Sequence, residues 1–329
     1  MKKIAMIASA ITLLVPEIAS CGRVANPGYI IDRTSYQEDG SGGVSARSAA
    51  TGPTWLLRNI ISIGGEVCEV RTLNGFNTFD GGGRHSLRSI CISASIKTIS
   101  EKCLELCDSL TVTFESGSRL ETIEEFAFRY SYLASICIPS SVEMLGSASF
   151  VGCQSLSSLM FGSGSKLKTI SGFAFNRCSS LASICIPSSV ERLGNVSFVE
   201  CRSLSRLTFG SGSRIRTIEE GAFSGCSSLA SICLPSSLER VEGKCFKDCT
   251  SLIIVEFKPN SQLKTIGSFA FSGCSSLASI WLPSSVERIE EGCFEGCGSL
   301  SIVEFEPGSQ PITIEEGAIP ESVETVGLD

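Results

Sequence analysis

Seventeen cysteines give this 329-residue chain most of its capacity for chemistry, because thiols form disulfides, bind metals and act as nucleophiles. Eight of them recur in the pattern Cys-x-Ser-Leu. If such positions stack in register, parallel Cβ atoms lie about 4.8 Å apart, outside the usual disulfide separation of about 3.8 Å. We therefore expect free, buried thiols that pack as small apolar groups. The eight are Cys107, Cys153, Cys178, Cys201, Cys226, Cys249, Cys274 and Cys297.

Three further cysteines, Cys103, Cys245 and Cys293, each lie four residues ahead of one of these eight. A zinc site would need histidines or a second matched pair, and none of the spacings supplies them. Other copies carry Ala174 or Ser197 at the same place, so a small buried residue explains the position. We predict no metal site and no cofactor.

A third set of cysteines, Cys91, Cys137, Cys185 and Cys233, stands between two inward residues in Ile-Cys-Ile or a close variant. Strand alternation turns this position outward. An exposed Trp beside carboxylates is a candidate contact anchor, since Trp is enriched at binding hot spots; the alternatives are an ordinary surface aromatic and a position covered by the C-terminal residues. The candidate binding face is Met160, Thr208, Glu256, Trp281 and Glu304, which follow the cysteines and Thr113 along one strip.

Composition argues against catalysis and against nucleic acid. The chain has a single histidine, His85, and no Ser or Cys nucleophile has a base in its repeat context, so we expect no catalytic residues and no enzyme. The formal net charge of −7 lacks the positive field that a phosphate backbone requires.

The cysteines are positioned by a repeat. Units begin at Arg84, Cys107, Tyr130, Cys153 and at six further cysteines down to Cys297, and from Tyr130 their lengths alternate between 23 and 25 residues. Such a unit cannot bury its apolar side alone, and stacking makes that side a continuous core. A period of 20 to 29 residues with regular leucines is typical of a leucine-rich repeat. In the unit from Cys226 we expect six inward residues: Leu229, Ile232, Leu234, Leu238, Val241 and Phe246.

The phrase "IPSSVERLG" followed by Phe and Cys-x-Ser-Leu resembles the BspA-like leucine-rich repeats over Arg84 to about Glu321. The resemblance implies a repeat solenoid, a right-handed leucine-rich-repeat superhelix of about ten turns, mostly β, with a parallel sheet and little helix. It also implies a bacterial or protist surface protein, and several such proteins adhere to host or matrix proteins. The 25-residue units, where "GSGS" replaces the Pro-x-Ser corner, depart from the family pattern.

Charged residues also repeat. One outward position alternates in sign along seven turns, and opposite charges at strand spacing attract weakly, so we interpret them as stacking and register devices. The acidic pairs Glu124-Glu125, Glu219-Glu220, Glu290-Glu291 and Glu315-Glu316 predict a solvated acidic edge. The stacking charges are Glu143, Lys168, Glu191, Arg216, Glu239, Lys264 and Glu287.

The N-terminus has the order of a secretory signal peptide: two lysines, an apolar run from Ile4 to Val15 and a break at Pro16. Ile18-Ala19-Ser20-Cys21 resembles a bacterial lipobox, which implies lipidation at Cys21; ordinary cleavage near the same place is the alternative. The predicted domains are a signal peptide (1–21), a flexible tether (22–54), an N-terminal cap (55–83), ten repeats (84–321) and a shortened C-terminal turn (322–329).

Together these features predict a non-enzymatic protein-binding solenoid that is exported, surface-attached and adhesin-like. It would be a cell-surface or outer-membrane lipoprotein, or secreted, and would contact membranes only through a lipid on Cys21. The partner would be a protein, for example a host or matrix protein. The alternative is an intracellular scaffold with an uncleaved apolar N-terminus, which suits the many free thiols better.

Overall fold

The structure is a computed structural model that describes residues 89–309 and 312–327, together with six strands between residues 29 and 74. The predicted signal peptide and Cys21 lie outside the described residues. Among the residues that are described, none belongs to an α-helix, and no helix there could cross a membrane.

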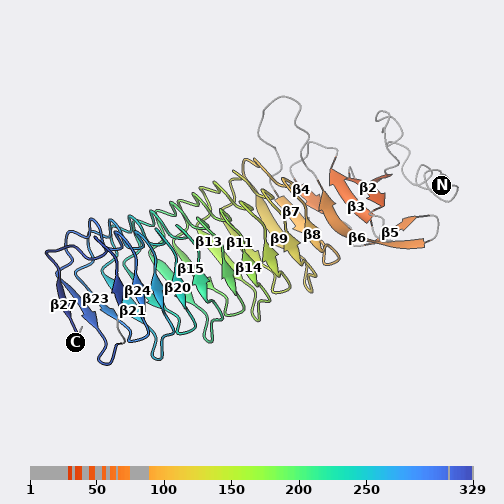
Figure 1. The fold of residues 1–329 in the computed structure, drawn as a ribbon. Helices are drawn as coiled ribbons and strands as arrows, with labels where there is room; N and C mark the ends of the chain where they lie inside the picture. Colours follow the sequence, from red (N-terminus) through yellow and green to blue (C-terminus); the bar gives the residue numbers. More distant parts are fainter. Residues whose placement is uncertain are drawn as a thin grey trace.

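The described chain is an elongated stack of turns in sequence order (Figure 1). Strands of four residues and strands of two residues alternate along it and form two separate sides of the stack. We call the first side the long-strand face. Its strands are β7 (Ser89–Ile92), β9 (Thr111–Phe114), β11 (Ser135–Ile138), β13 (Ser158–Phe161), β15 (Ser183–Ile186), β17 (Arg206–Phe209), β19 (Ser231–Leu234), β21 (Ile254–Phe257), β23 (Ser279–Leu282), β25 (Ile302–Phe305) and the three-residue β27 (Glu324–Val326).

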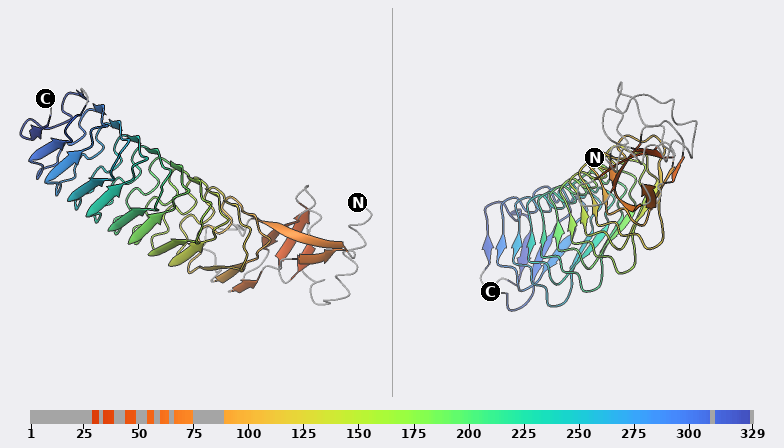
Figure 2. Two further views of the ribbon diagram at one scale, coloured as in Figure 1. Left: turned by 90° about the horizontal axis from the view of Figure 1, so that it is seen from below. Right: turned by 90° about the vertical axis from the view of Figure 1, so that its right-hand side faces the viewer.

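The second side, the short-strand face, is a continuous parallel ladder in which each strand pairs with the next turn. The long strands show as a row of arrows along one side of the stack (Figure 2). This arrangement confirms the predicted parallel β-solenoid of about ten turns. The short strands are β8 (Thr98–Ile99), β10 (Thr122–Ile123), β12 (Met144–Leu145), β14 (Thr169–Ile170), β16 (Arg192–Leu193), β18 (Thr217–Ile218), β20 (Arg240–Val241), β22 (Thr265–Ile266), β24 (Arg288–Ile289) and β26 (Thr313–Ile314).

The core is built from the same residue of every turn. Leu229, Ile232, Leu238 and Phe246 are buried as the repeat pattern predicts. Eight phenylalanines, from Phe128 to Phe294, form one stack with ring centroids between 4.8 and 5.7 Å apart. Stacking identical units thus converts one apolar stripe per turn into a continuous interior.

Pairing on the long-strand face is interrupted. Four residue pairs join β11 to β13 and four join β15 to β17, but β13 and β15 share no paired residue. The cause lies in the sequence after each strand: Gly162 donates to the carbonyl of Ile138 at 2.9 Å, whereas the next turn has Pro187 at that place. Because proline has no N–H, it cannot donate to the preceding turn, and the strands separate there.

The N-terminal strands extend the solenoid. Strand β4 pairs in parallel with β7, and β6 pairs with β8, so each face continues into the range predicted as a cap. Strands β1, β2 and β3 form antiparallel pairs and join β6 through β3. Strands β1, β2 and β3 lie within the range 22–54. The bounds are β1 (Tyr29–Ile31), β2 (Thr34–Glu38), β3 (Val44–Ser48), β4 (Thr54–Leu56), β5 (Ile60–Ile63) and β6 (Glu66–Asn74).

Candidate functional site

One column of side chains runs outward along the long-strand face, and we call it the outer column. Register fixes it: Cys137 pairs with Met160, Cys185 with Thr208, and Trp281 with Glu304. Every member is exposed except Cys91, which is half-buried. Its members are Cys91, Thr113, Cys137, Met160, Cys185, Thr208, Cys233, Glu256, Trp281 and Glu304.

The column places all five predicted binding residues on one surface. Met160 is 57% exposed and Trp281 is 39% exposed. Trp281 is followed on this face by β25 and β27, so two further strands lie beyond it and it is not the last residue of the column. For most of its length the column carries Cys, Thr and Met, and the charged members are Glu256 and Glu304 near the C-terminal end.

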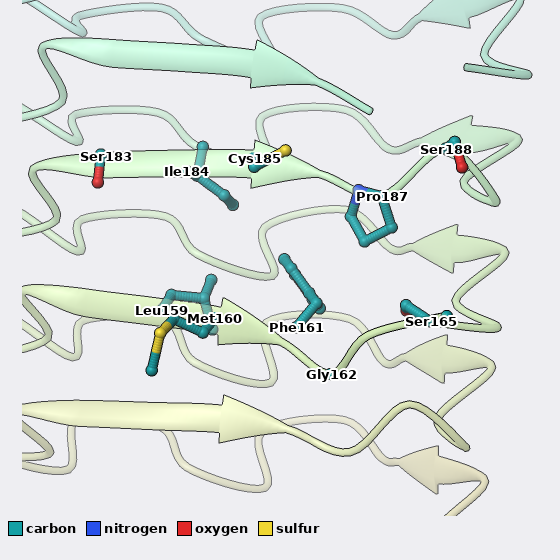
Figure 3. A pocket seen from close by; sticks show the side chains of 11 residues that line it. Leu159, Met160, Phe161, Gly162, Ser165, Ser183, Ile184, Cys185, Pro187 and Ser188 are labelled. Atoms are coloured by element: carbon teal, nitrogen blue, oxygen red, sulfur yellow. The ribbon is translucent and has the colours of Figure 1, made fainter. Parts of the chain in front are cut away.

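The interrupted pairing leaves a groove between β13 and β15, with a volume of about 510 Å³. Phe161 and Pro187 project into the space between the two strands, and Met160 and Cys185 lie on its two sides (Figure 3). A second groove involves β17, β19 and β21 and is lined by Thr208, Cys233 and Glu256 among others. The lining of the first groove is apolar and small polar, whereas that of the second also includes Arg206, Glu256 and Lys258.

Two exposed isoleucines on this face escape the sequence prediction. Ile253 is 54% exposed and Ile254 is 49% exposed. The preceding long strand has Ala230 and Ser231 at these positions, and the following one has Ala278 and Ser279. The other 25-residue units have Ser157, Ser205 and Ser301 where Ile253 stands, so the large apolar residue at position 253 was the available signal in the sequence.

The Cys-x-Ser-Leu cysteines lie inside the solenoid with free thiols. Burial raises the pKa of Cys153 and of Cys201 to about 12, which keeps both thiols protonated and poorly nucleophilic. Cys245 and Cys293 are buried as well. Across residues 89–309 and 312–327, no three His, Cys, Asp or Glu side chains gather closely enough to hold a metal ion.

The stacking charges form discrete ion pairs. Lys168 Nζ lies 2.7 Å from Glu143, Arg216 Nη1 lies 2.8 Å from Glu239, and Lys264 Nζ lies 3.2 Å from Glu287. The hydrogen bond from Lys168 lowers the pKa of Glu143. Within the described part of the chain, Glu191 lies within ion-pair distance of no cation. The ion pairs of this set therefore link turns two at a time and do not form one continuous row. Because such pairs are exposed, each adds little to the free energy of unfolding.

The acidic pairs do more than form a solvated edge. Glu219 accepts a hydrogen bond from the Asn195 backbone N–H at 3.0 Å, and Glu315 accepts one from Glu291 N–H at 2.9 Å. Glu290 does the same for Ser268 at 3.1 Å. The first glutamate of each pair thereby satisfies a backbone donor in the preceding turn, which composition alone did not indicate.

Known proteins share these features. A family model described as the BspA type leucine rich repeat region matches in six copies over residues 75–205 and 195–322. No curated protein sequence matches. The crystal structure of the pneumococcal vaccine antigen PcpA superposes with a TM-score of 0.60 at 22% identity, covering 93% of this chain and 94% of that chain. A leucine rich cell surface protein from Faecalibacterium prausnitzii A2-165 has a TM-score of 0.44 at 19% identity, covering 93% and 95%. Because the family model spans most of its length, the chain belongs to the BspA-type leucine-rich repeat family.

Proposed function

We propose that this protein is a non-enzymatic binding protein that engages a protein partner through the long-strand face. Leucine-rich repeat domains generally mediate protein binding, and one observation supports that role here. The outer column is an extended row of exposed, mostly uncharged side chains, backed by a core whose residues repeat in every turn. Interface cores are depleted of charge, so such a row can be desolvated at low cost.

The binding test uses two variants of the outer column, Met160→Asp and Thr208→Arg, which add a charge without touching the core. Lys264→Gln, which changes one of the stacking charges and lies outside the outer column, is the matched control. Immobilised host and matrix proteins serve as the panel. We expect a partner to bind the wild type and the control alike, and to lose at least tenfold in affinity with either column variant. Equal binding by all four chains would exclude the long-strand face.

We further propose that the protein is exported and held at the cell surface as an adhesin-like lipoprotein. The N-terminal lysines, the apolar run and the lipobox-like Ile18–Cys21 support this proposal. The pneumococcal protein of the same fold is described as a vaccine antigen, which accords with a surface position.

The fifteen free cysteines favour a second candidate, an intracellular scaffold, because thiols persist in reducing compartments. Intact mass and membrane fractionation of the native protein beside Cys21→Ala separate the two. A processed chain carrying a diacylglyceryl group, absent from the variant, supports surface attachment. An unprocessed chain in the cytosol supports the scaffold.

A further inference from the structure

We infer that Ile253, Ile254, Glu256, Trp281 and Glu304 form a docking site for a basic segment of the partner, with a Lys or Arg side chain against the Trp281 indole. This inference rests on the proposed protein-binding function and specifies where and what that face binds. We call these five residues the C-terminal patch.

The apolar part of the C-terminal patch has no role in the core. Ile253 and Ile254 are 54% and 49% exposed, and Trp281 in the next turn is 39% exposed. Other turns carry Ala, Ser or another small or polar residue at most of these positions, for example Ala182 and Ser183. Since the solenoid packs equally well with small residues there, the three large side chains offer apolar area to something outside the chain.

The carboxylates of the C-terminal patch stand on either side of the tryptophan. Glu304 pairs with Trp281 in the β23–β25 register, and Glu256 holds the same position one turn earlier. Paired strands lie about 4.8 Å apart, which brings Glu304 within reach of a group bound on the indole. Strands β21 and β23 share no paired residue, so Glu256 lies on the other side of an interruption, where a longer bound segment can reach it. The contact is therefore acidic on two sides and aromatic between them.

Neither carboxylate is neutralised by the described part of the chain. In the described ranges, Glu256 and Glu304 form no ion pair, whereas the stacking charges Glu143 and Glu239 each bind a cation. Arg206 and Lys258 line the same groove as Glu256 without forming an ion pair with it. A partner that covered these carboxylates without supplying a cation would leave them desolvated and unpaired, which is costly.

Charge complementarity therefore selects a cationic segment over an acidic or a wholly apolar one. A guanidinium or ammonium over an indole gains cation–π attraction, and the flanking carboxylates add to it. The aliphatic stem of Lys or Arg, or a neighbouring aliphatic residue, would cover Ile253 and Ile254. The formal net charge of −7 adds a long-range negative field that also attracts a cationic segment.

A phage library of random 12-residue peptides, selected in parallel on the full wild-type chain and on Trp281→Ala, tests the inference. We expect peptides enriched only on the wild type, with Lys or Arg beside an aliphatic residue in their consensus. A synthetic consensus peptide should bind Trp281→Ala at least tenfold more weakly. It should bind the Glu256→Gln/Glu304→Gln double variant at least fivefold more weakly at 50 mM salt, with a smaller difference at 300 mM salt.

Ser180→Ala, at an exposed position outside both the outer column and the C-terminal patch, is the control and should bind like the wild type. Circular dichroism melting of each variant checks that the fold is intact. A consensus without a cation, enrichment that survives Trp281→Ala, or no enrichment at all would overturn the inference. The proposed function fails by a different result, namely equal partner binding by Met160→Asp, Thr208→Arg and the wild type.

Discussion

The thiol of Cys178 donates a hydrogen bond to the carbonyl oxygen of Phe150, 28 residues earlier, at a sulfur–oxygen distance of 3.2 Å. The same carbonyl also accepts the backbone N–H of Cys153 in its own turn. Seven cysteines, from Cys153 to Cys297, repeat this contact with a phenylalanine of the preceding turn. The buried cysteines thus fill space as apolar groups and also join neighbouring turns beside the Phe stack.

Replacing Cys178 separates these two roles. We expect Cys178→Ala to lower the free energy of unfolding by about 1 to 2 kcal/mol, because a buried atom is lost while Phe150 keeps its backbone donor. Cys178→Ser should cost at least as much, since a hydroxyl is harder to desolvate than a thiol. Urea denaturation measures both, with the exposed Ser180→Ala as the control. Wild-type stability in the Ser variant would show that packing contributes little and the hydrogen bond most.

Alkaline pH should destabilise the protein through the same thiols. An unfolded thiol has a pKa near 8.5, whereas burial raises that of Cys201 to about 12. Below about pH 8.5 both states are protonated and the contribution to stability is complete; between about 8.5 and 12 only the unfolded state loses its proton, so stability falls as pH rises.

The cost of Cys201→Ala should therefore be about 2 kcal/mol smaller at pH 10 than at pH 8, at roughly 1.4 kcal/mol per pH unit. Urea denaturation at both values measures the difference. Leu204→Ala, a buried neighbour without a titrating group, should cost the same at each pH. A pH-independent cost for Cys201→Ala would contradict the buried, protonated thiol.

Thiol labelling of the native protein should distinguish the outer column from the core. Of fifteen described cysteines, Cys137, Cys185 and Cys233 are exposed, Cys91 is half-buried and the remaining eleven are buried. In a Cys21→Ser/Cys68→Ser background at pH 8 we expect the three exposed thiols to react with iodoacetamide first and Cys91 more slowly. Peptide mass spectrometry locates the label. Labelling of Cys153 or Cys226 in the folded chain would show that the core is open.

The hydroxyls of two fully buried serines find no hydrogen-bond partner among the described residues. They are Ser149 Oγ and Ser197 Oγ, at a position where other turns have Ala127 or Ala174. Because a buried unsatisfied hydroxyl is unfavourable, Ser149→Ala and Ser197→Ala should each raise the free energy of unfolding by about 1 kcal/mol. Thermal and urea unfolding measure the gain. A loss of stability in both variants would show that the hydroxyls are satisfied in solution.

Val196 has a backbone φ of 49°, which is unfavourable for a β-branched residue. Glycine holds the equivalent place at Gly221 and Gly292, with φ values of 63° and 61°. We expect Val196→Gly to raise the free energy of unfolding by about 1 kcal/mol by relieving this strain. The reverse change, Gly221→Ala, should destabilise, since its new Cβ would lie 3.0 Å from Val196 Cγ1. A destabilised Val196→Gly would mean that the valine contacts outweigh the strain.

The solenoid, its core and the direction of the cysteines all follow from the repeat pattern of the sequence. A unit repeated at a nearly constant length must place Leu229 or Phe246 at the same point of every turn, and stacking buries that point. Strand alternation and the repeat position likewise predict that Cys178 points into the core and Cys185 points outward. Both predictions were possible because the environment of each cysteine is set within one unit.

Features that depend on the relation between neighbouring turns are visible in the three-dimensional structure alone. The missing N–H of Pro187 interrupts pairing between β13 and β15, so a groove lies where the repeat suggests an even sheet. Glu143 binds Lys168, whereas Glu256 forms no ion pair with any described residue, and this difference depends on which side chains lie opposite in the next turn. The exposed fractions of Ile253 and Trp281 likewise depend on the side chains of the neighbouring turns, because several turns together form the surface around each residue.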